Sequence, residues 1–454
     1  MEQTQKSVLF EKTPIPKAVA TLAMPTVLSS LVVVLYSLAD TWFVGMVNDP
    51  VQNAAVTLAS PVLLAFNAVN NLFGVGTSSM MGRALGRRDL DTVKRSSAFG
   101  MWGSIASGLL FSLLFTVFKV PLLDILGAVP ENAAVTSDYL YWTVTLGAAP
   151  SILNVVMAYL VRTEGSSMHA SIGTMSGCGL NILLDPVFVL YFGMGAAGAG
   201  LATFVSNCAA CLYFVVLLFI RRKESMVCMN PVMARPKKEI VIEICAVGIP
   251  ASIQNLLNVT GMTVLNKFTS EFGSDAVAAM GIAYKIYMVP MQVAFGFTQG
   301  IMPLVSYNYG SRNYRRAKKS VDFTAKIAVS FLACTAFLFF ACSGGLMRLF
   351  IQNEQIIRYG KSFLRGMCLG LPFLCMDFLG VMTFQACGMG IFSLIFAFLR
   401  KIVLEIPALF LLNYLFPLYG LAYAQSVTEF ILSAVSSAAL IRLFRALEQQ
   451  KPAG

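Results

Sequence analysis

Residues 31–45 read LVVVLYSLADTWFVG and residues 177–192 read GCGLNILLDPVFVLYF, so each of two long apolar stretches holds one acid, Asp40 or Asp185. A helix that crossed a bilayer there would carry a carboxylate through hydrocarbon. Such a placement costs roughly 2.5–3.5 kcal/mol on insertion scales, which makes each acid a candidate for function. Binding a cation is the use that we expect of these two carboxylates.

The composition of the 454-residue chain is that of a membrane protein, because 57% of the residues are hydrophobic and 12% are charged. About twelve stretches approach the length that a helix needs to span a bilayer. They are residues 18–44, 54–81, 96–118, 139–161, 171–192, 198–220, 240–268, 276–305, 323–343, 357–383, 391–412 and 419–443. The pattern predicts an all-α polytopic membrane protein with about twelve transmembrane helices.

Lysine and arginine gather on one side of this trace. The basic stretches are residues 6–17, 83–95, 221–238, 312–319, 400–401 and 442–451, and residues 348–365 are a basic exception on the other side. Because basic loops remain cytoplasmic during insertion, we expect both termini in the cytoplasm. The net charge of +11 is then a topology signal, and we expect no nucleic-acid partner.

The chain repeats itself. A shift of 225 residues lays Pro25 on Pro250, and a shift of 224 lays Gly86 on Gly310. The repeat covers six helices, an even number, so the two copies enter the membrane from the same face and are parallel repeats. We expect an N-terminal six-helix lobe over residues 1–220, a basic cytoplasmic linker over 221–239 and a C-terminal six-helix lobe over 240–454.

Two parallel lobes are typical of secondary transporters, in which one lobe rocks against the other around a site between them. ATP-driven transport is disfavoured, because the only Gly-Lys-Ser triplet, at residues 360–362, has Gln355 where a phosphate-binding loop needs its first glycine. An embedded enzyme would need a catalytic histidine or a metal set, and one histidine, His169, is too few for a multi-histidine metal site. We therefore expect no enzymatic activity and no cofactor.

The surroundings of Asp185 suit a coupling ion. Asn181 lies four residues earlier and shares its helix face, and Pro186 cannot bond back to the carbonyl of Ile182. Carboxylate, amide and carbonyl oxygens together suit Na⁺, and a buried carboxyl beside a like charge suits a proton equally well. The structural alternatives are that Asp185 caps a broken helix and that Asp40 lies at a helix end.

These residues resemble the multidrug and toxic compound extrusion (MATE) transporters, in particular the bacterial MepA-like or DinF-like branch. The resemblance covers nearly the whole chain. The matching motifs are Pro25, the LADTWFVG run at 38–45, RTEG at 162–165, NxxxDP at 181–186, GxGLAT at 198–203 and PxxSYNYG at 303–310. The resemblance implies two six-helix lobes in a V-shaped bundle of the MATE/MOP type. It also implies export of amphipathic, often cationic compounds across the bacterial inner (plasma) membrane in exchange for H⁺ or Na⁺.

Position by position, the family's cation site falls on Asp40, Asn181, Asp185 and Thr203, which would be the Na⁺ ligands if Na⁺ is the coupling ion. Further candidates for this network or for the substrate cavity are Tyr36, Asn154, Asn258, Lys285, Asp377 and Glu405. One branch of the family has an essential glutamate where this chain has Asn258. For Lys285 two interpretations are open: it pairs with Asp377 or Glu405, or it extends toward an interface.

The expected partners are amphipathic small molecules and the lipid bilayer, and we expect a monomer. The alternative function is a flippase of lipid-linked precursors in the same superfamily. A flippase of that kind needs a cluster of Arg and Lys in the cavity, and Lys285 is the one clear mid-helix candidate in the sequence.

Overall fold

The computed structural model describes residues 2–47, 49–235 and 237–449, and within them the chain is helical and contains no strand. The first part comprises α1 (Glu2–Glu11), α2 (Ile15–Met46), α3 (Pro50–Asn70), η1 (Asn71–Val75), α4 (Gly76–Gly86), α5 (Leu90–Val117), α6 (Lys119–Ile125), α7 (Ala133–Leu140), η2 (Tyr141–Leu146), α8 (Ala148–Thr163), α9 (Ser167–Asp185), η3 (Pro186–Tyr191), α10 (Gly195–Ile220) and the 3₁₀ turn η4 (Pro231–Ala234).

The second part comprises α11 (Lys238–Ser270), α12 (Ser274–Gly310), α13 (Tyr314–Ala341), α14 (Ser343–Arg348), α15 (Glu354–Cys368), α16 (Leu371–Ala386), α17 (Gly390–Phe398), η5 (Leu399–Glu405), α18 (Ile406–Leu415) and α19 (Tyr419–Gln449). The segments η1, η2, η3 and η5 are π-helical.

The predicted all-α membrane fold is confirmed. In the described part of the chain, nine helical segments are long and apolar enough to cross a membrane, and counting each of two bent pairs as one span gives eleven. The predicted span at 391–412 forms α17, η5 and α18, and Arg400, Lys401 and Glu405 lie in its π-helical segment. These two basic residues were expected to mark a cytoplasmic loop, and that expectation is wrong.

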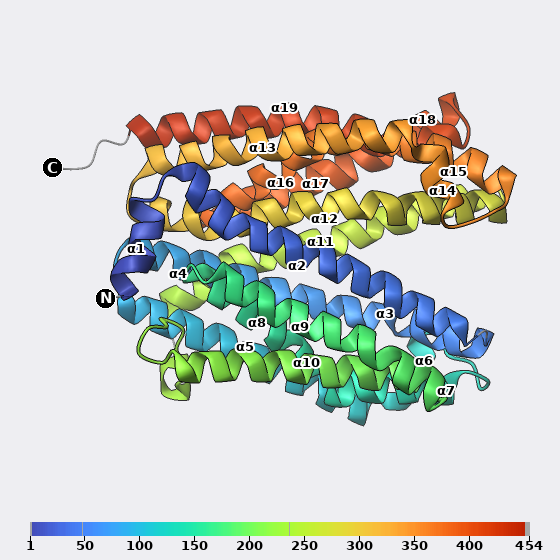
Figure 1. The fold of residues 1–454 in the computed structure, drawn as a ribbon, viewed down its shortest axis with the longest axis horizontal. Helices are drawn as coiled ribbons and strands as arrows, with labels where there is room; N and C mark the ends of the chain where they lie inside the picture. The colour runs from blue at the N-terminus through green and yellow to red at the C-terminus, as the bar shows by residue number, and fades with distance from the viewer. Residues whose placement is uncertain (1, 48, 236, 450–454) are drawn as a thin grey trace.

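Figure 1 shows the helices of the first part on one side of the bundle and those of the second part on the other. Helix α2 runs between them and packs along both α9 and α12. Helix α1 and the last turns of α19 lie at the same end of the bundle. The predicted lobe boundaries remain predictions, and Pro236 of the linker, residues 450–454 of the last lobe and the side chain of Lys6 lie outside what the structure describes.

The two parts are interrupted at corresponding places. Pro25 lies inside α2 and Pro250 inside α11. The chain bends by 50° between η2 and α8, and by 48° between α15 and α16. Helix α9 ends at Asp185 and continues as η3 from Pro186, and η5 similarly precedes the helix that contains Pro407. A proline supplies no N–H to the preceding turn, which explains why regular α-helix stops there.

The two parts touch at the end of the bundle where α1 lies. Arg83 of α4 pairs with Glu243 of α11 at 3.1 Å. Ser79 Oγ on α4 donates to the carbonyl of Gln385 on α16. The ends of α4 and α12 approach so closely that a methyl group on Gly86 would collide with the carbonyl oxygen of Tyr307. This end is therefore closed by direct backbone contact.

Helix α1 covers the closed end. The Phe10 ring is 2% exposed and stacks on Tyr307 with ring centroids 4.8 Å apart. The Tyr307 hydroxyl donates to Glu11 Oε1 at 2.7 Å, and Asn308 Nδ2 donates to the Phe10 carbonyl at 3.2 Å. Arg316 of α13 donates to the same carbonyl at 2.6 Å. Thus α1 is held by the second part of the chain, across the closed end.

The stretch after α10 is tied to the first part of the chain. Glu164 Oε2 accepts hydrogen bonds from Ser225 Oγ at 2.9 Å and from the Met226 amide at 2.8 Å. Trp102 Nε1 on α5 donates to the carbonyl of Met229 at 3.0 Å. The predicted linker therefore packs on the first part, and its turn η4 also lies against α5.

Candidate functional site

Asp185 and Asn181 face each other on α9, and both are buried, with 0% and 2% of their surface exposed. With the amide nitrogen of Asn181 turned toward the carboxylate, it donates to Asp185 Oδ2 at 2.8 Å. The amide oxygen then accepts from the Thr203 amide at 3.1 Å and from Thr203 Oγ1 at 3.2 Å. The opposite orientation keeps a bond from Asn181 Nδ2 to Thr203 Oγ1 at 3.2 Å but points oxygen at oxygen, so we assign the first orientation.

Helix α2 brings Asp40 and Tyr36 to this pair. The Tyr36 hydroxyl hydrogen-bonds to Thr203, and the Asp40 carboxylate lies within electrostatic range of Asp185. Asp40 lies six residues before the end of α2 and is therefore inside the helix. Asp185 makes no side-chain capping bond to the segment that follows it. Neither structural alternative for these acids, a helix cap or a helix end, describes what they do here.

Sequence reasoning missed one neighbour of the two carboxylates. Tyr139 of α7 is 5% exposed and lies within electrostatic range of both Asp40 and Asp185. Tyr139 lies at the start of an apolar stretch and belongs to no motif, so no sequence signal could have identified it. Asn154, which was a candidate for this network, instead donates from Nδ2 to Asn207 Oδ1 at 3.1 Å. The structure thus gives Asn154 a partner outside the cluster.

No basic side chain neutralises the two carboxylates of this cluster in the described part of the chain, where no Lys or Arg forms an ion pair with Asp40 or Asp185. No group of three or more His, Cys, Asp or Glu side chains that could hold a metal occurs among these residues either. What remains is a set of oxygen donors, two carboxylates with an amide and a hydroxyl, and such a set accommodates Na⁺ or a proton.

A second buried charge cluster lies in the other part of the chain. Arg400 Nη1 is 3.4 Å from Asp377 Oδ2, and Arg400 Nη2 is 2.5 Å from Glu429 Oε1. Lys401 Nζ lies 2.8 and 2.6 Å from the two carboxylate oxygens of Glu405. All five side chains are buried. Asp377 and Glu405 were candidates from the sequence, whereas Glu429 was not, and Arg400 and Lys401 were expected in a loop.

The predicted role of Lys285 changes as a result. Asp377 and Glu405 pair with Arg400 and Lys401, so the interpretation in which Lys285 neutralises one of them is wrong. Lys285 lies exposed on α12 and does not line the central cavity. The other interpretation, in which Lys285 extends toward an interface, stays a prediction.

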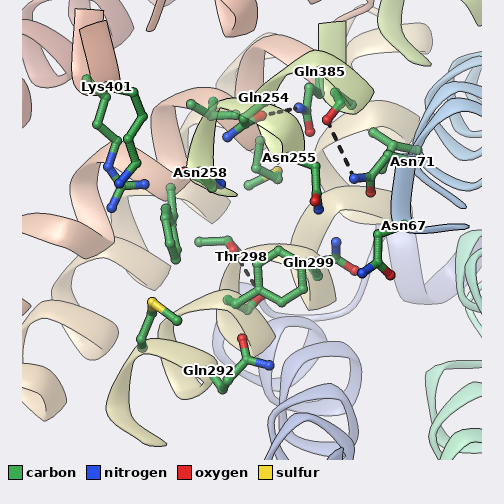
Figure 2. Close-up of a pocket in the computed structure, with 18 of the residues that line it drawn as sticks. Asn67, Asn71, Gln254, Asn255, Asn258, Gln292, Thr298, Gln299, Gln385 and Lys401 are labelled. Atoms are coloured by element: carbon green, nitrogen blue, oxygen red, sulfur yellow. Dashed lines mark hydrogen bonds between the residues drawn. The ribbon is translucent and has the colours of Figure 1, made fainter. Parts of the chain in front are cut away.

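Between the two parts of the chain lies a cavity of about 490 Å³. Its walls come from α2, α3, η1, α11, α12, α16, η5 and α19, and nine of its lining residues carry side-chain amides. These nine are Asn67, Asn71, Gln254, Asn255, Asn258, Gln292, Gln299, Gln385 and Gln425. Figure 2 shows eight of them converging on a common space, with Lys401 at one side. Two of the candidate residues that the sequence predicted, Asn258 and Glu405, line this cavity.

Apolar groups complete the cavity wall. Phe295, Phe378 and Tyr284 supply aromatic faces, and four methionines supply flexible ones. The guanidinium of Arg400 stacks over the Phe378 ring at 5.3 Å from the centroid. Amide, aromatic and thioether groups together suit amphipathic organic molecules, because polar contacts orient a ligand whose apolar body fills the remaining space.

A second cavity of about 430 Å³ lies at the closed end. Its wall includes Phe10 of α1, Leu85 of α4, Glu164 at the end of α8, Met226 after α10 and Tyr307 of α12. It therefore touches both parts of the chain and the helix that covers them.

One acid outside the membrane-spanning segments has a shifted pKa. Asp89 precedes α5 and accepts from Thr92 Oγ1 at 2.6 Å and from the Thr92 amide at 3.1 Å. These hydrogen bonds to the carboxylate, first from the hydroxyl and then from the backbone, lower the pKa of Asp89. Asp89 is thus a helix cap at the closed end and lies apart from both charge clusters.

Several known proteins are similar to this chain in sequence and fold. The MatE family model matches residues 25–187 and again residues 250–415. The multidrug export protein MepA of Staphylococcus aureus (strain MRSA252) is 32% identical over 437 residues, which are 96% of this chain and 95% of that protein. MepA of Staphylococcus saprophyticus is 30% identical over 438 residues, again 96% of this chain and 95% of the relative.

Solved structures agree. A MATE protein crystallised in complex with MaL6 has a TM-score of 0.93 at 25% identity, covering 98% of this chain and 99% of that one. The outward-facing conformation of a multidrug resistance MATE family transporter of the MOP superfamily has a TM-score of 0.90 at 26% identity, covering 98% of both chains. The resemblance noted in the sequence is therefore confirmed, and the chain belongs to the MatE family of transporters.

Proposed function

We propose that this protein is a secondary active multidrug exporter, which moves amphipathic small molecules out across the bacterial plasma membrane in exchange for H⁺ or Na⁺. The export activity is supported by the multidrug export proteins to which the chain is similar over nearly its full length. The coupling is supported by the cluster of Asp40, Asn181, Asp185 and Thr203.

The buried carboxylate of Asp185 carries the coupling proposal. It is 0% exposed, it receives a hydrogen bond from Asn181, and the described part of the chain offers it no Lys or Arg counter-charge. A buried carboxylate without a counter-charge is strongly disfavoured, so a proton or Na⁺ must neutralise it in this conformation. Opening the site to water on the other side would remove that requirement and release the ion.

Helix α2 links this ion site to the central cavity. Val33 lines the cavity, and Tyr36 and Asp40 lie about one and two turns farther along the same helix, at the ion site. A cation bound at Asp40 and a ligand packed against Val33 would therefore both contact helix α2. If each favours a different position of α2, binding of one promotes release of the other, which is the requirement for exchange.

The present conformation is one of the two states that exchange requires. The cavity is closed at the end where α1 lies, by the Arg83–Glu243 pair and the contact of α4 with α12. We propose that this end is cytoplasmic, because basic residues gather there, including Arg87 and Arg88 after α4. Both termini are then cytoplasmic, residues 1–220 and 240–454 act as the two moving lobes, and one chain suffices for the cycle.

The flippase alternative is less favoured by the cavity. Moving a pyrophosphate headgroup calls for cations that are free to bind it. Arg400 and Lys401 do reach the cavity, but each is held by at least one carboxylate of its own cluster. Transport of a fluorescent lipid without an ion gradient would favour the flippase.

Vesicle transport tests the proposal. Purified protein in liposomes should accumulate at least one of two amphipathic dyes, the cation rhodamine 123 and the zwitterion rhodamine 110, when a pH or Na⁺ gradient is imposed, each gradient tested without the other. Asp40→Asn and Asp185→Asn should abolish the gradient-driven part, while Asp138→Asn, at an exposed acid beside Tyr139, should retain it. Full-rate gradient-driven uptake by both site variants would exclude this coupling site, and no uptake under either gradient would exclude the antiporter.

A further inference from the structure

One arginine between the two parts of the chain is buried without an acid. Arg162 lies at the end of α8 and is 7% exposed. Among the residues that the structure describes, no carboxylate forms an ion pair with its guanidinium. Its Nε is enclosed and has no hydrogen-bond partner there. The other buried cations of the described chain, Arg83, Arg400 and Lys401, each pair with an acid, so Arg162 differs from all of them.

Neutral groups hold the Arg162 guanidinium, and one of them belongs to the other part of the chain. Arg162 Nη1 donates to Gln299 Oε1 on α12 at 3.3 Å, which is longer than the roughly 2.7–2.9 Å of a good bond to a carboxylate. The guanidinium also lies over the Tyr159 ring, 5.7 Å from its centroid. Gln299 Nε2 donates to the Tyr159 hydroxyl at 2.5 Å. Both ends of the Gln299 amide are thus bonded across the interface to α8.

The internal repeat indicates that this position does not need a charge. The turns after α8 and after α16 each contain a glycine with positive φ, Gly165 at 90° and Gly388 at 82°. Three residues before these glycines stand Arg162 in the first part and Gln385 in the second. The backbone carbonyl of Gln385 accepts from Ser79 Oγ across the interface. The second copy therefore contacts the opposite part of the chain through a neutral residue.

Burial of Arg162 makes the closed conformation less stable than its packing alone would make it. A charge taken out of water without an opposite charge costs free energy, and a neutral hydrogen bond offsets only part of that cost. When the two parts of the chain separate at the closed end, α8 and α12 move apart and water can reach the guanidinium. The cost is therefore specific to the closed conformation.

We propose that Arg162 destabilises the closed conformation and thereby sets how readily this end of the transporter reopens. Gln299 is the positioning residue that opposes it, because its amide holds the buried guanidinium. Removal of the cation should then stabilise closure, and removal of the amide should weaken it. This inference rests on the proposed exchange cycle, in which the closed end must reopen after each export step. It assigns control of that step to a residue outside both charge clusters.

Amide hydrogen exchange of the full-length protein in nanodiscs tests these opposite signs. The peptides that cover residues 80–86 and 304–310 report opening, under conditions in which exchange follows the equilibrium between closed and open states. Arg162→Met should slow exchange in both peptides at least fivefold and raise the Tm, whereas Gln299→Leu should accelerate exchange at least fivefold. If Arg162 serves only packing, Arg162→Met exchanges faster or does not fold. Either of these results, or unchanged exchange, would overturn the proposal.

Three further variants assign the effect to the buried charge. The double variant Arg162→Met with Gln299→Leu should exchange at nearly the rate of Arg162→Met, because the amide no longer has a cation to hold, and additive effects would contradict the pairing. Arg162→Lys keeps the charge and should stay within threefold of the wild-type rate. Slowing as large as in Arg162→Met would exclude the charge as the cause.

Arg222→Met is the matched control. Arg222 also lies over an aromatic ring, that of Phe219 at 5.6 Å from the centroid, but its side chain is exposed. The exchange rates of both peptides should stay within twofold of the wild type in this variant. An effect as large as that of Arg162→Met would contradict a role specific to the buried guanidinium.

Transport measurements keep this proposal distinct from the proposed function. In liposomes, Arg162→Met should lower the maximal rate of gradient-driven dye uptake at least fivefold, because each cycle waits for the closed end to reopen. Opposite exchange effects in the two single variants, with no gradient-driven uptake by the wild type, would refute exchange transport and leave the effect of Arg162 on closure standing. Gradient-driven uptake by the wild type without the opposite exchange effects would refute the role of Arg162 and leave exchange transport standing.

Discussion

Gly86 and Gly310 pack against each other's helix ends. A methyl group on Gly86 would collide with the Tyr307 carbonyl oxygen and lie 3.0 Å from the carbonyl carbon of Gly310, and a methyl group on Gly310 would collide with the Arg83 carbonyl oxygen. The two glycines are 224 residues apart and occupy equivalent positions of the internal repeat. The closed end is therefore a reciprocal contact between repeated elements, at a distance that only glycine allows.

Gly310→Ala should prevent this end from closing fully, because the obstructing atoms belong to the backbone of α4 and cannot rotate away. We expect faster amide hydrogen exchange over residues 307–313 and at least a fivefold lower rate of gradient-driven transport. Gly281→Ala is the matched control on the same helix, since nothing lies within 4 Å of an added methyl group there. Identical exchange and transport in the two variants would show that the glycine contact does not control closure.

Asn181→Ala should impair coupling. The variant removes the amide that donates to Asp185 at 2.8 Å, a charge-assisted bond worth about 1.5–3 kcal/mol. The initial rate of dye uptake under an imposed gradient should fall roughly tenfold or more. Asn154→Ala breaks a bond to Asn207 outside the cluster and should change this rate less than twofold. Equal losses in both variants would assign the effect to helix packing.

Arg400→Met should destabilise the protein, because Asp377 and Glu429 would remain buried without their counter-charge. Breaking a buried pair in this way costs about 3–5 kcal/mol. The measurement is thermal unfolding of the purified protein in detergent. Arg348→Met, which breaks an exposed pair with Glu354, should cost about 0–1 kcal/mol. Adding Asp377→Asn to Arg400→Met should restore part of the loss, and a further loss would contradict the ion-pair explanation.

Phe10→Ala should release α1 from the closed end. Phe10 is 2% exposed and stacks on Tyr307, and truncating a buried phenylalanine costs about 3–5 kcal/mol. Deuterium uptake in the peptide that covers residues 7–13 should increase strongly. Val8 lies on the same helix and is 38% exposed, so Val8→Ala should leave uptake unchanged. If Phe10→Ala also leaves uptake unchanged, the stacked ring does not hold α1.

The start of α5 should lose protection in acid. The pKa of Asp89 is lowered by hydrogen bonds from Thr92, so the ionised carboxylate stabilises the folded helix start. This contribution is complete above the ordinary carboxyl pKa of about 4 and is lost as the pH falls through the lowered value. Amide exchange over residues 90–93, corrected for its intrinsic pH dependence, should therefore accelerate only in acid. Asp89→Asn should remove this acid-dependent acceleration, and its persistence would point to another group.

Much of the fold was predictable because membrane spans are long and their composition is distinctive. The pairing of Asn181 with Asp185 was also accessible, since a four-residue spacing places two side chains on one helix face. That Thr203 and Tyr36 lie beside Asn181 and Asp185 could be expected only from the family resemblance. Periodicity says nothing about which helices become neighbours.

The charge cluster around Arg400 was not predictable in the same way. Basic residues mark cytoplasmic loops because an unpaired cation rarely enters the membrane. Arg400 and Lys401 are exceptions because buried carboxylates neutralise them. The two partners of Arg400, Asp377 and Glu429, lie 23 and 29 residues from it in sequence. Only the packing of α16, η5 and α19 brings these charges together.

The cavity at the closed end has a pharmacological consequence. A small molecule wedged among Phe10, Leu85, Glu164, Met226 and Tyr307 would bind the first part of the chain, the second part and α1 at once. It would hold the transporter shut without occupying the amide-lined cavity. Such an inhibitor would be non-competitive, because the two cavities share no lining residue and a high concentration of drug in one would not displace a molecule from the other.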